Sequence, residues 1–598
     1  MTTSIASATL APASPTGGVV TGRGKEHRQY YLNKMSLRSL FERAGKFHPD
    51  TVVRTRIAGN RYHSITYRQH QERCELLASG LTALGIRAGE VIGTFMWNNS
   101  RHLQAYHAVP VMGCVLHTLN IRLHPEKLNY IIQHAGDTVL IVDQVLLKLL
   151  SKVPREAFRH VKLFIICGRD ETSIDDQTQA DLPLPQLPPS CRVLSYEKVL
   201  GLGRSPFQWP QIEEDAPMAL CYTSGTTGRP KGVMYSHKSQ YLTVLGNLSA
   251  GQQGFRSIDT ALPVVPMFHA MAWGIPYAAL AAGCGLVLTN EHTKPDMVAD
   301  MVLDNGVTVL SGVPTIWQGL QRALKTDPER YRPIKGVLRR GTVGGSKFSL
   351  ELLRWFWDKW GVEVLQTWGM TETNPLGTAA RRLDGHKQLV QFDDSHLDTA
   401  GRPVLGVDAK IVDPKTKKEA PHDGKTVGEL LVRGPTIVTA YYKKIGGTKK
   451  SFVDGWLDTG DLASISPGGY VCIHDRSKDV IKSGGEWISS IDMENHIREM
   501  PGVKYCCVIG VPHPKWDERP IAVVELEDQG IPLSLKAVRS HCSKIFAKFQ
   551  LPDDLLVWKS VPVSGTGKID KKIVRAKLKS EGYVHPQLKA HPPIQSKL

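Results

Sequence analysis

The sequence predicts an α/β protein: a large N-terminal multi-sheet α/β domain followed by a small, mobile C-terminal α+β domain. Three observations support this fold class. The chain has 598 residues, which exceeds the usual size of one hydrophobic core. Strand-like and helix-like patterns alternate through much of the chain, as in α/β proteins. Past about residue 475 the predicted strand and helix units become smaller, which indicates a separate domain.

The alternation is clearest between residues 90 and 145 and returns twice further on. Apolar patterns and helix-ending glycines predict strands at 90–96 and 138–142 and helices at 102–112 and 125–134. The later units are a strand at 307–311, a helix opened by Pro314, and a strand at 362–366.

The C-terminal part predicts a compact α+β unit. Its expected elements are a helix at 490–500, strands at 505–511 and 521–526, a helix from about Ser534 to before Pro552, and a strand at 555–561. We therefore expect an N-terminal domain over 35–477 and a C-terminal domain over 478–585.

The net charge is +17, from 74 Lys and Arg against 57 Asp and Glu. A basic surface suits nucleic acid, anionic membrane or phosphate-rich small molecules, and charge alone does not choose among them. No zinc-finger, helix-turn-helix or RNA-recognition signature appears, so no nucleic-acid partner is expected. The ten cysteines form no CxxC pair and are typical of reduced intracellular thiols.

Residues 260–290 contain no Asp, Glu, Lys or Arg, but Pro263, Pro266 and several glycines interrupt the run. A buried strand-turn-helix region explains it better than a membrane span. We expect no transmembrane segment, and peripheral membrane contact stays open.

Both ends of the chain predict tails. Residues 1–34 begin with an uncharged Ser/Thr/Ala/Gly-rich stretch that predicts disorder. Residues 586–598 end in Ser596-Lys597-Leu598, the peroxisomal import address that a receptor reads. We therefore expect a peroxisomal location and an import receptor as a partner.

The strongest local motif is a loop that follows the apolar strand at 218–222. It reads Tyr222-Thr223-Ser224-Gly225-Thr226-Thr227-Gly228-Arg229-Pro230-Lys231-Gly232. Glycines let backbone N–H groups approach an anion, and the hydroxyls and the lysine add donors and charge. The loop therefore predicts a polyphosphate cradle, although it lacks the Gly-Lys-Ser/Thr ending of a Walker loop.

This loop resembles the signature of the adenylate-forming superfamily, which includes acyl-CoA synthetases, luciferases and peptide-synthetase adenylation domains. The resemblance extends from about residue 35 to 580. Five further segments match family motifs in order: Thr367-Trp368-Gly369-Met370-Thr371-Glu372, Asp458-Thr459-Gly460-Asp461, Asp475-Arg476-Ser477-Lys478-Asp479, Ser483-Gly484-Gly485-Glu486 and Gly565-Thr566-Gly567-Lys568.

The resemblance implies roles for these residues. Lys568, Glu372 and Thr371 would be catalytic, and Thr223 and Glu372 would hold Mg²⁺. Lys478 would be the hinge between the domains, at a position where many relatives have aspartate. The residues implied to bind ATP or coenzyme A are Thr223, Ser224, Gly225, Thr226, Thr227, Gly228, Lys231, Gly344, Gly345, Ser346, Trp368, Gly369, Asp461, Arg476, Ser483, Gly484, Gly485 and Glu486.

The chemistry agrees with these roles. A carboxylate must attack an α-phosphate, and both are anions, so cations such as Mg²⁺ and a lysine are needed between them. A carboxylate such as Asp461 can accept two hydrogen bonds from a ribose diol. By resemblance, His269 and Trp273 line the acyl channel, although a core tryptophan would explain Trp273 nearly as well.

The amino-acid sequence at 264–269, 368–372 and 481–489 resembles that of medium-chain fatty-acyl-CoA ligases. The expected activity is ATP-dependent conversion of a carboxylic acid, a medium- or long-chain fatty acid, to an acyl-adenylate with release of pyrophosphate. The acyl group is then transferred to coenzyme A with release of AMP, so ATP, Mg²⁺ and coenzyme A are required. The alternatives are an aryl-acid (cinnamate- or benzoate-type) CoA ligase, a luciferase-like oxygenase, or an acyl-CoA-binding pseudoenzyme.

Overall fold

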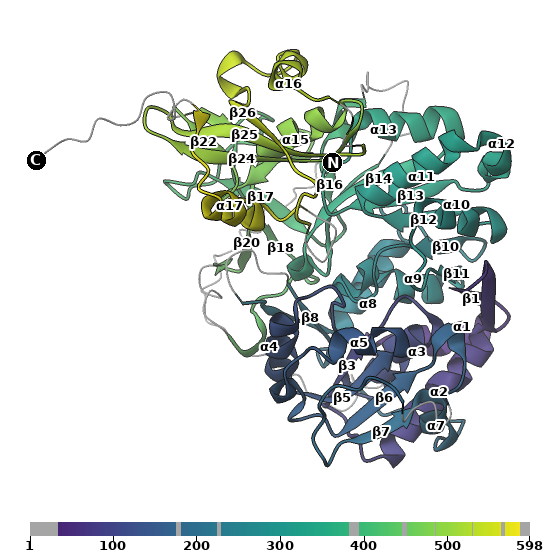
Figure 1. Cartoon of the computed structure of the whole chain (residues 1–598). Coiled ribbons are helices and arrows are strands. Elements are labelled where there is room, and N and C mark those ends of the chain that lie inside the picture. The colour runs from purple at the N-terminus through teal and green to yellow at the C-terminus, as the bar shows by residue number, and fades with distance from the viewer. Residues whose placement is uncertain are drawn as a thin grey trace, which may run out of the picture. The chain divides into compact units, whose positions relative to one another are not determined.

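Alternating strands and helices build two large, mainly parallel sheets in the N-terminal part of the protein (Figure 1). The chain divides into Met1–Lys34 and Met35–Leu598. The computed structural model describes residues 34–174, 181–223, 229–381, 394–444, 451–484, 486–528, 530, 532–563 and 569–586. The predicted tails lie outside these residues except for Lys34 and Pro586.

The first sheet has the strand order β7-β6-β5-β3-β4-β8-β9 and is parallel except where β9 joins β8. The strands predicted at 90–96 and 138–142 and the helices predicted at 102–112 and 125–134 are confirmed. The elements are β3 (Val91–Phe95), β4 (Val115–Thr118), β5 (Asp137–Asp143), β6 (Leu163–Cys167), β7 (Arg192–Ser195), β8 (Pro217–Tyr222), β9 (Gly232–Ser236), α2 (Tyr67–Ala83), α3 (Ser100–Val111), α4 (Pro125–Ala135), α5 (Leu147–Leu150) and α7 (Tyr196–Gly201).

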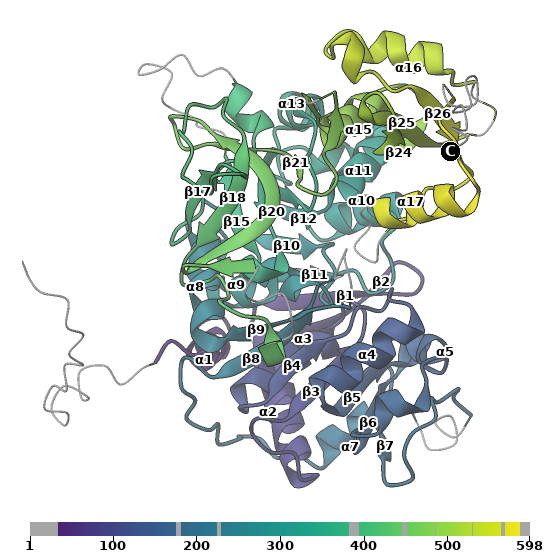
Figure 2. The same cartoon turned by 90° about the vertical axis from the view of Figure 1, so that its left-hand side faces the viewer.

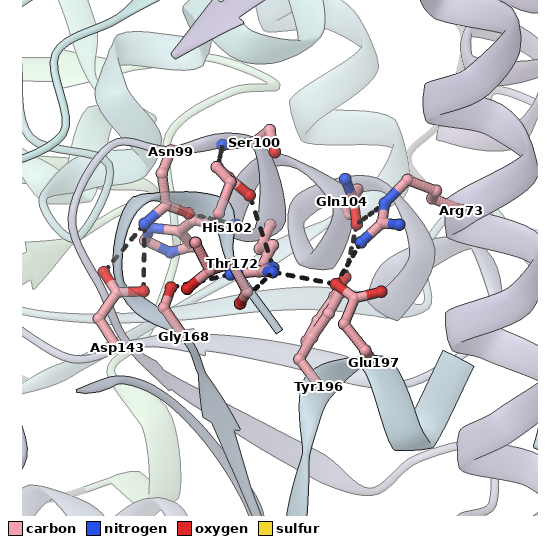
Figure 3. A network of polar contacts seen from close by, with 12 residues as sticks. Arg73, Asn99, Ser100, His102, Gln104, Asp143, Gly168, Thr172, Tyr196 and Glu197 are labelled. Carbon is pink, nitrogen blue, oxygen red and sulfur yellow. Dashed lines mark hydrogen bonds and ion pairs between the residues drawn. The ribbon is translucent and has the colours of Figure 1, made fainter. Parts of the chain in front are cut away.

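A polar network fixes the start of α3 against the carboxyl ends of β5 and β6 (Figure 3). The Asn99 side chain caps α3 and donates to both oxygens of Asp143, at 3.1 and 2.9 Å. The buried Arg101 guanidinium donates to the Gly168 carbonyl at 2.9 Å and pairs with Glu197 at 3.0 Å. Because every α3 residue is buried, these polar groups need partners inside the protein, and the network supplies them.

The second sheet has the order β16-β15-β14-β13-β12-β10-β11-β1-β2, with parallel pairing from β14 through β1. The uncharged run 260–290 forms β10, α9 and β11, so the predicted buried strand-turn-helix is confirmed. The elements are β1 (Val52–Ile57), β2 (Arg61–Thr66), β10 (Thr260–Pro263), β11 (Gly285–Leu288), β12 (Val309–Gly312), β13 (Arg340–Gly344), β14 (Glu363–Gly369), β15 (Leu376–Ala380), β16 (Arg402–Pro403), α1 (Leu37–Phe47), α8 (His237–Leu248), α9 (Ile275–Ala282), α10 (Pro295–Asp304), α11 (Pro314–Thr326), α12 (Pro328–Tyr331) and α13 (Leu350–Trp355).

An antiparallel five-stranded sheet follows, which the sequence analysis did not predict. Its order is β17-β18-β20-β19, and β21 pairs with β20. The strands are β17 (Asp408–Val412), β18 (Gly428–Arg433), β19 (Phe452–Val453), β20 (Trp456–Ile465) and β21 (Val471–Arg476). This sheet carries Asp461 and Arg476 on neighbouring strands.

The C-terminal region forms its own sheet, with α16 and α17 on opposite sides of β24–β26 (Figure 2). Side chains of β24 alternate between two cores: Cys506 and Val508 pack with α15 and α16, whereas Cys507 and Ile509 pack with α17, as strand geometry requires. The elements are β22 (Ile481–Ser483), β23 (Glu486–Ile488), β24 (Val503–His513), β25 (Asp517–Leu526), β26 (Asp554–Val557), α15 (Ser490–Arg498), α16 (Leu535–Cys542) and α17 (Lys571–Ser580).

Two predicted bounds in this region are wrong. The helix predicted from Ser534 to before Pro552 ends at Cys542, and a turn and a short 3₁₀ segment at 548–550 complete the connection. The strand predicted at 555–561 ends at Val557, because its pairing with β25 stops there. Among the described residues, no helix has the length and apolar character needed to cross a bilayer.

The buried carboxylate of Asp259 ties together the amino ends of three neighbouring parallel strands. Asp259 precedes β10 and accepts from the Thr308 hydroxyl, which precedes β12, at 2.9 Å. It also pairs with Arg340 at 2.8 Å and Arg339 at 2.9 Å, at the start of β13. Burial opposes its charge, but hydrogen bonds from Arg256 and Thr308 and the Arg340 charge hold the pKa of Asp259 below its ordinary value.

We predict that Asp259→Asn destabilises the protein by about 2 kcal/mol at pH 7, because hydrogen bonds to a buried charge are lost. The folded pKa lies below the unfolded value of about 3.9, so this stabilisation is present above that pH and is lost as the pH falls through the folded pKa. The melting-temperature gap between wild type and variant should therefore be wide at pH 7 and narrow towards pH 3.

Asp408→Asn is the matched control, since Asp408 pairs with Arg433 at 2.9 Å while both side chains are more than half exposed. An exposed pair contributes about 0–1 kcal/mol. Equal losses of stability in the two variants would contradict the stabilising role assigned to the buried Asp259 carboxylate. A melting-temperature gap for Asp259→Asn that does not change with pH would contradict it as well.

Candidate active site

The parallel pairing of β13 and β14 brings two predicted nucleotide segments together at one edge of the sheet. Gly344, the last residue of β13, lies opposite Thr367 of β14. A Cβ on Gly344 would lie 2.7 Å from the Thr367 hydroxyl and 3.3 Å from the Trp273 ring. The position therefore requires glycine. Gly345 follows in a left-handed conformation, with φ of +95°, and Ser346 is exposed.

Trp368, Asp461 and Arg476 meet although they come from two different sheets. The Trp368 indole donates to Asp461 Oδ2 at 3.0 Å. Arg476 Nε pairs with Asp461 Oδ1 at 2.9 Å across β20 and β21. Asp461 is buried, while the Arg476 side chain is 39% exposed. The carboxylate is thus held in one orientation at the end of β14, and the three predicted residues form one cluster.

The Glu372 carboxylate is buried in the turn after β14, where Tyr441 donates to its Oε1 at 2.8 Å. Burial raises the pKa of Glu372, and the Tyr441 hydrogen bond and the Arg476 and Lys231 charges oppose that rise. Lys231 Nζ lies over the Tyr441 ring, 4.4 Å from its centroid. At the base of the glycine-rich loop, Thr223 N donates to the Lys231 carbonyl at 3.0 Å. A carboxylate and a lysine therefore share one aromatic neighbour.

The segment predicted to line the acyl channel has an unusual backbone. Residues 270–273 all have positive φ, from 42° to 58°, and Gly274 follows at 73°. Left-handed conformation costs about 1–2 kcal/mol for each non-glycine residue, so packing around the segment must maintain it. Trp273 is buried and His269 is half-buried.

Helix α8 connects this segment to the Glu372 turn. Asn247 donates from α8 to the Trp273 carbonyl at 3.0 Å. Thr243, one turn earlier, donates to the Asn374 carbonyl at 3.0 Å. Tyr235 of β9 donates to the Thr371 carbonyl at 2.6 Å. No local motif in the sequence predicts Asn247, Thr243, Tyr235 or Tyr441, because their partners are distant in sequence.

The predicted coenzyme A turn lies between β22 and β23. The Ser483 hydroxyl accepts from Arg519 at 3.0 Å, and Arg519 also holds the buried Asp553 through two hydrogen bonds of 2.6 and 2.8 Å. Gly484 has φ of +61°, and a Cβ there would lie 2.8 Å from the Trp516 ring. Glu486 is exposed. Arg519 is thus a further residue that supports the turn.

The remaining predicted residues are placed as follows. Lys478 is exposed in the turn between β21 and β22. Gly369 passes so close to the Pro375 carbonyl that a Cβ would lie 1.8 Å from its oxygen. Ser224, Gly225, Thr226, Thr227, Gly228, Gly485 and Lys568 lie outside the described residues, so their roles stay predictions.

Fold and site together define a nucleotide-binding α/β enzyme with a distinct C-terminal unit. Residues 41–442 match the family model described as AMP-binding enzyme, and residues 492–568 match the AMP-binding enzyme C-terminal domain. The chain therefore belongs to the AMP-binding enzyme family.

Relatives match over nearly their whole length. A 3-methylmercaptopropionyl-CoA ligase from Ruegeria lacuscaerulensis is 37% identical over 92% of this chain and 98% of its own. A medium-chain fatty-acid–CoA ligase from Ectopseudomonas oleovorans is 36% identical over 92% of this chain and 97% of its own. The crystal structure of ATP-bound MatB from Rhodopseudomonas palustris aligns with a TM-score of 0.74, 26% identity, and coverage of 91% of this chain and 99% of that chain.

We predict that Tyr441→Phe lowers kcat/KM for ATP by about tenfold, because it removes a hydrogen bond to the charged Glu372, worth about 1.5–3 kcal/mol. The measurement is steady-state pyrophosphate release at varied ATP and Mg²⁺ concentrations, and the apparent affinity for Mg²⁺ should fall as well.

Tyr442→Phe is the control, since the Tyr442 hydroxyl contacts only the Ala135 carbonyl at 3.5 Å among its described partners. It should retain near wild-type kinetics. If both variants have the same kcat/KM for ATP and the same apparent affinity for Mg²⁺, Tyr441 does not act through Glu372.

Proposed function

We propose that this protein, an AMP-forming acyl-CoA ligase, acts on medium-chain fatty acids and works in the peroxisome. The observation that carries the activity is the position of Gly344 between Thr367 and Trp273, where a Cβ would lie 2.7 Å from the Thr367 hydroxyl and 3.3 Å from the Trp273 ring. It joins the strand ends expected to bind a nucleotide to the segment expected to bind an acyl chain. An acid held at this junction would lie beside the phosphates that it must attack.

In the first half-reaction the acid carboxylate attacks the α-phosphorus of ATP, an acyl–phosphate bond forms, and pyrophosphate leaves. Lys231 and the donors of the 223–232 loop would orient the phosphates, and Asp461 would accept from the ribose hydroxyls. Mg²⁺, which carboxylate oxygens such as those of Glu372 suit, would neutralise phosphate charge when bound. Lys568 would supply the cation between the two anions.

In the second half-reaction the coenzyme A thiol attacks the acyl carbon of the adenylate. A thioester forms, the thiol proton passes to solvent, and AMP leaves. The turn at Ser483–Glu486 would guide the thiol, and Arg519 would hold that turn in place through Ser483. The two halves need different neighbours at one site, which supports rotation of the C-terminal region about Lys478.

The lining of the expected channel supports an aliphatic acid of medium chain length. The run 260–290 is uncharged, and most of its side chains are buried. Each methylene buried there contributes about 0.8 kcal/mol, or about a fourfold gain in kcat/KM. The medium-chain relative from Ectopseudomonas oleovorans supports the same range.

We predict that kcat/KM rises from acetate to octanoate by roughly fourfold per methylene and levels off where the channel ends. Pyrophosphate release measured across aliphatic acids from C2 to C18, with benzoate and cinnamate alongside, tests this.

Lys568→Ala prepared identically controls for contaminating ligases, since it should lose adenylation. Higher kcat/KM for acetate than for octanoate, or for cinnamate than for any aliphatic acid, would contradict the proposed substrate. Light from luciferin, ATP and oxygen would favour the oxygenase alternative instead.

The location rests on Ser596-Lys597-Leu598, and it gains support from plant relatives named as peroxisomal, a trans-cinnamate:CoA ligase and a butyrate–CoA ligase. We predict that the chain with a fluorescent tag before Met1 enters peroxisomes, whereas the same chain without residues 596–598 stays outside. Import of both forms would show that the tripeptide is not the address.

A further inference from the structure

A lysine and two acids are buried together where α15, α17 and β21 meet, apart from the residues assigned above to substrate or nucleotide. Lys571 is the first residue of α17, Glu494 lies in α15, and Asp475 lies in β21. The Lys571 and Glu494 side chains are 12% and 11% exposed, and Asp475 is fully buried. Charged side chains are rarely buried unless they are paired and hydrogen-bonded, so the contacts of this cluster show what it holds in place.

Lys571 acts on both acids, on one directly and on the other through a serine. Lys571 Nζ pairs with Glu494 Oε1 at 2.9 Å and donates to the Ser490 hydroxyl. That hydroxyl donates in turn to Asp475 Oδ2 at 2.6 Å, and the Ser490 backbone N–H donates to the same oxygen at 2.7 Å. Burial raises the pKa of Asp475, and the Lys571 charge is the largest influence that opposes this rise. Lys571 therefore favours the ionised form of Asp475.

The Asp475 carboxylate holds the backbone from which the Arg476 side chain extends. Arg476 N donates to Asp475 Oδ1 at 2.7 Å, while Arg476 Nε pairs with Asp461 at 2.9 Å. The Ser489 hydroxyl donates to the His474 carbonyl at 2.6 Å, so the start of α15 is bonded to two successive residues of β21. These contacts fix the end of β21 from which Arg476 reaches Asp461.

A continuous series of polar contacts thus leads from α17 to the carboxylate expected to accept from the ribose hydroxyls. It starts at Lys571 and passes through Ser490, Asp475 and Arg476 to Asp461. Hydrogen bonds in such a series polarise and orient one another. The pair with Glu494 alone would satisfy a buried lysine that had only a structural role. The second branch, through the serine, is the one that reaches the predicted nucleotide site.

We propose that Lys571 is a positioning residue for nucleotide recognition, which orients Asp461 toward the ribose hydroxyls through Ser490, Asp475 and Arg476. This inference rests on the function proposed above, in which Asp461 accepts from the ribose. It implies a selective loss: without Lys571 the contacts to adenine and phosphate remain, and recognition of the ribose hydroxyls declines. A defect in packing alone would weaken the binding of nucleotides with and without these hydroxyls by the same factor.

The test is calorimetric titration of AMP and of 2′,3′-dideoxy-AMP into the full-length protein at about pH 7.5, near neutrality, where Asp and Glu are ordinarily ionised. Wild type should prefer AMP by about tenfold or more, because the dideoxy compound cannot donate to the Asp461 carboxylate. Lys571→Met should reduce this preference to about twofold, mainly by weakening the binding of AMP. Ser490→Ala, which leaves the pair of Lys571 with Glu494 in place, should reduce the preference by about threefold.

Lys579→Met, the same change at an exposed lysine of the same helix, is the matched control and should keep the wild-type preference. Melting curves show whether each variant folds; if Lys571→Met does not, Ser490→Ala still provides the test. The inference is overturned if the folded variants keep the wild-type preference, or if they weaken the binding of both nucleotides by the same factor. If wild type does not bind AMP, the proposed function itself is contradicted, which is a different result from an unchanged preference.

Discussion

The parallel pairing of β12, β13 and β14 is the constraint on which the candidate active site depends. Adjacent parallel strands have their carboxyl ends at the same edge of a sheet, so the residues that follow these strands lie close together. Gly344 lies beside Thr367 for this reason, and Trp368 and Glu372 follow within a few residues. At the opposite edge, Asp259 holds together the amino ends of β10, β12 and β13. Charged contacts thus hold one end of the sheet, and the predicted site residues lie at the other end.

The predicted nucleotide site contains buried carboxylates, although the ligand expected there is an anion. Asp461 is already held by Trp368 and Arg476, and Glu372 by Tyr441. In the predicted roles, Asp461 would accept from a hydroxyl pair and Glu372 would face a cation, so neither carboxylate would have to face phosphate directly. Lys231, which lies beside Tyr441, would then balance phosphate charge. The basic balance of the whole chain, +17, favours the same class of ligand.

Local patterns in the sequence predicted the α/β class, the strands β3, β5 and β8 and the helices α3 and α4 of the first sheet, and several segments that meet at the site. They succeeded where the signal spans few residues, as in the strand and loop from 218 to 232. They failed at the antiparallel sheet of β17–β21, because β17, β18, β19 and β21 each span six residues or fewer and give only a short strand signal. Tyr441 was missed for a related reason: its partner Glu372 is 69 positions away, and no short motif records such a contact.

The left-handed stretch at residues 270–273, in the segment predicted to line the acyl channel, limits which side chains can be exchanged there during evolution. In an ordinary helix a pocket can be widened or narrowed by exchanging one side chain for another. Here a β-branched replacement would also have to tolerate positive φ, and loss of the Asn247 contact would release the backbone itself. Substitutions in neighbouring elements such as α8 are therefore easier to accommodate than substitutions within residues 270–273, the segment predicted to line the acyl channel.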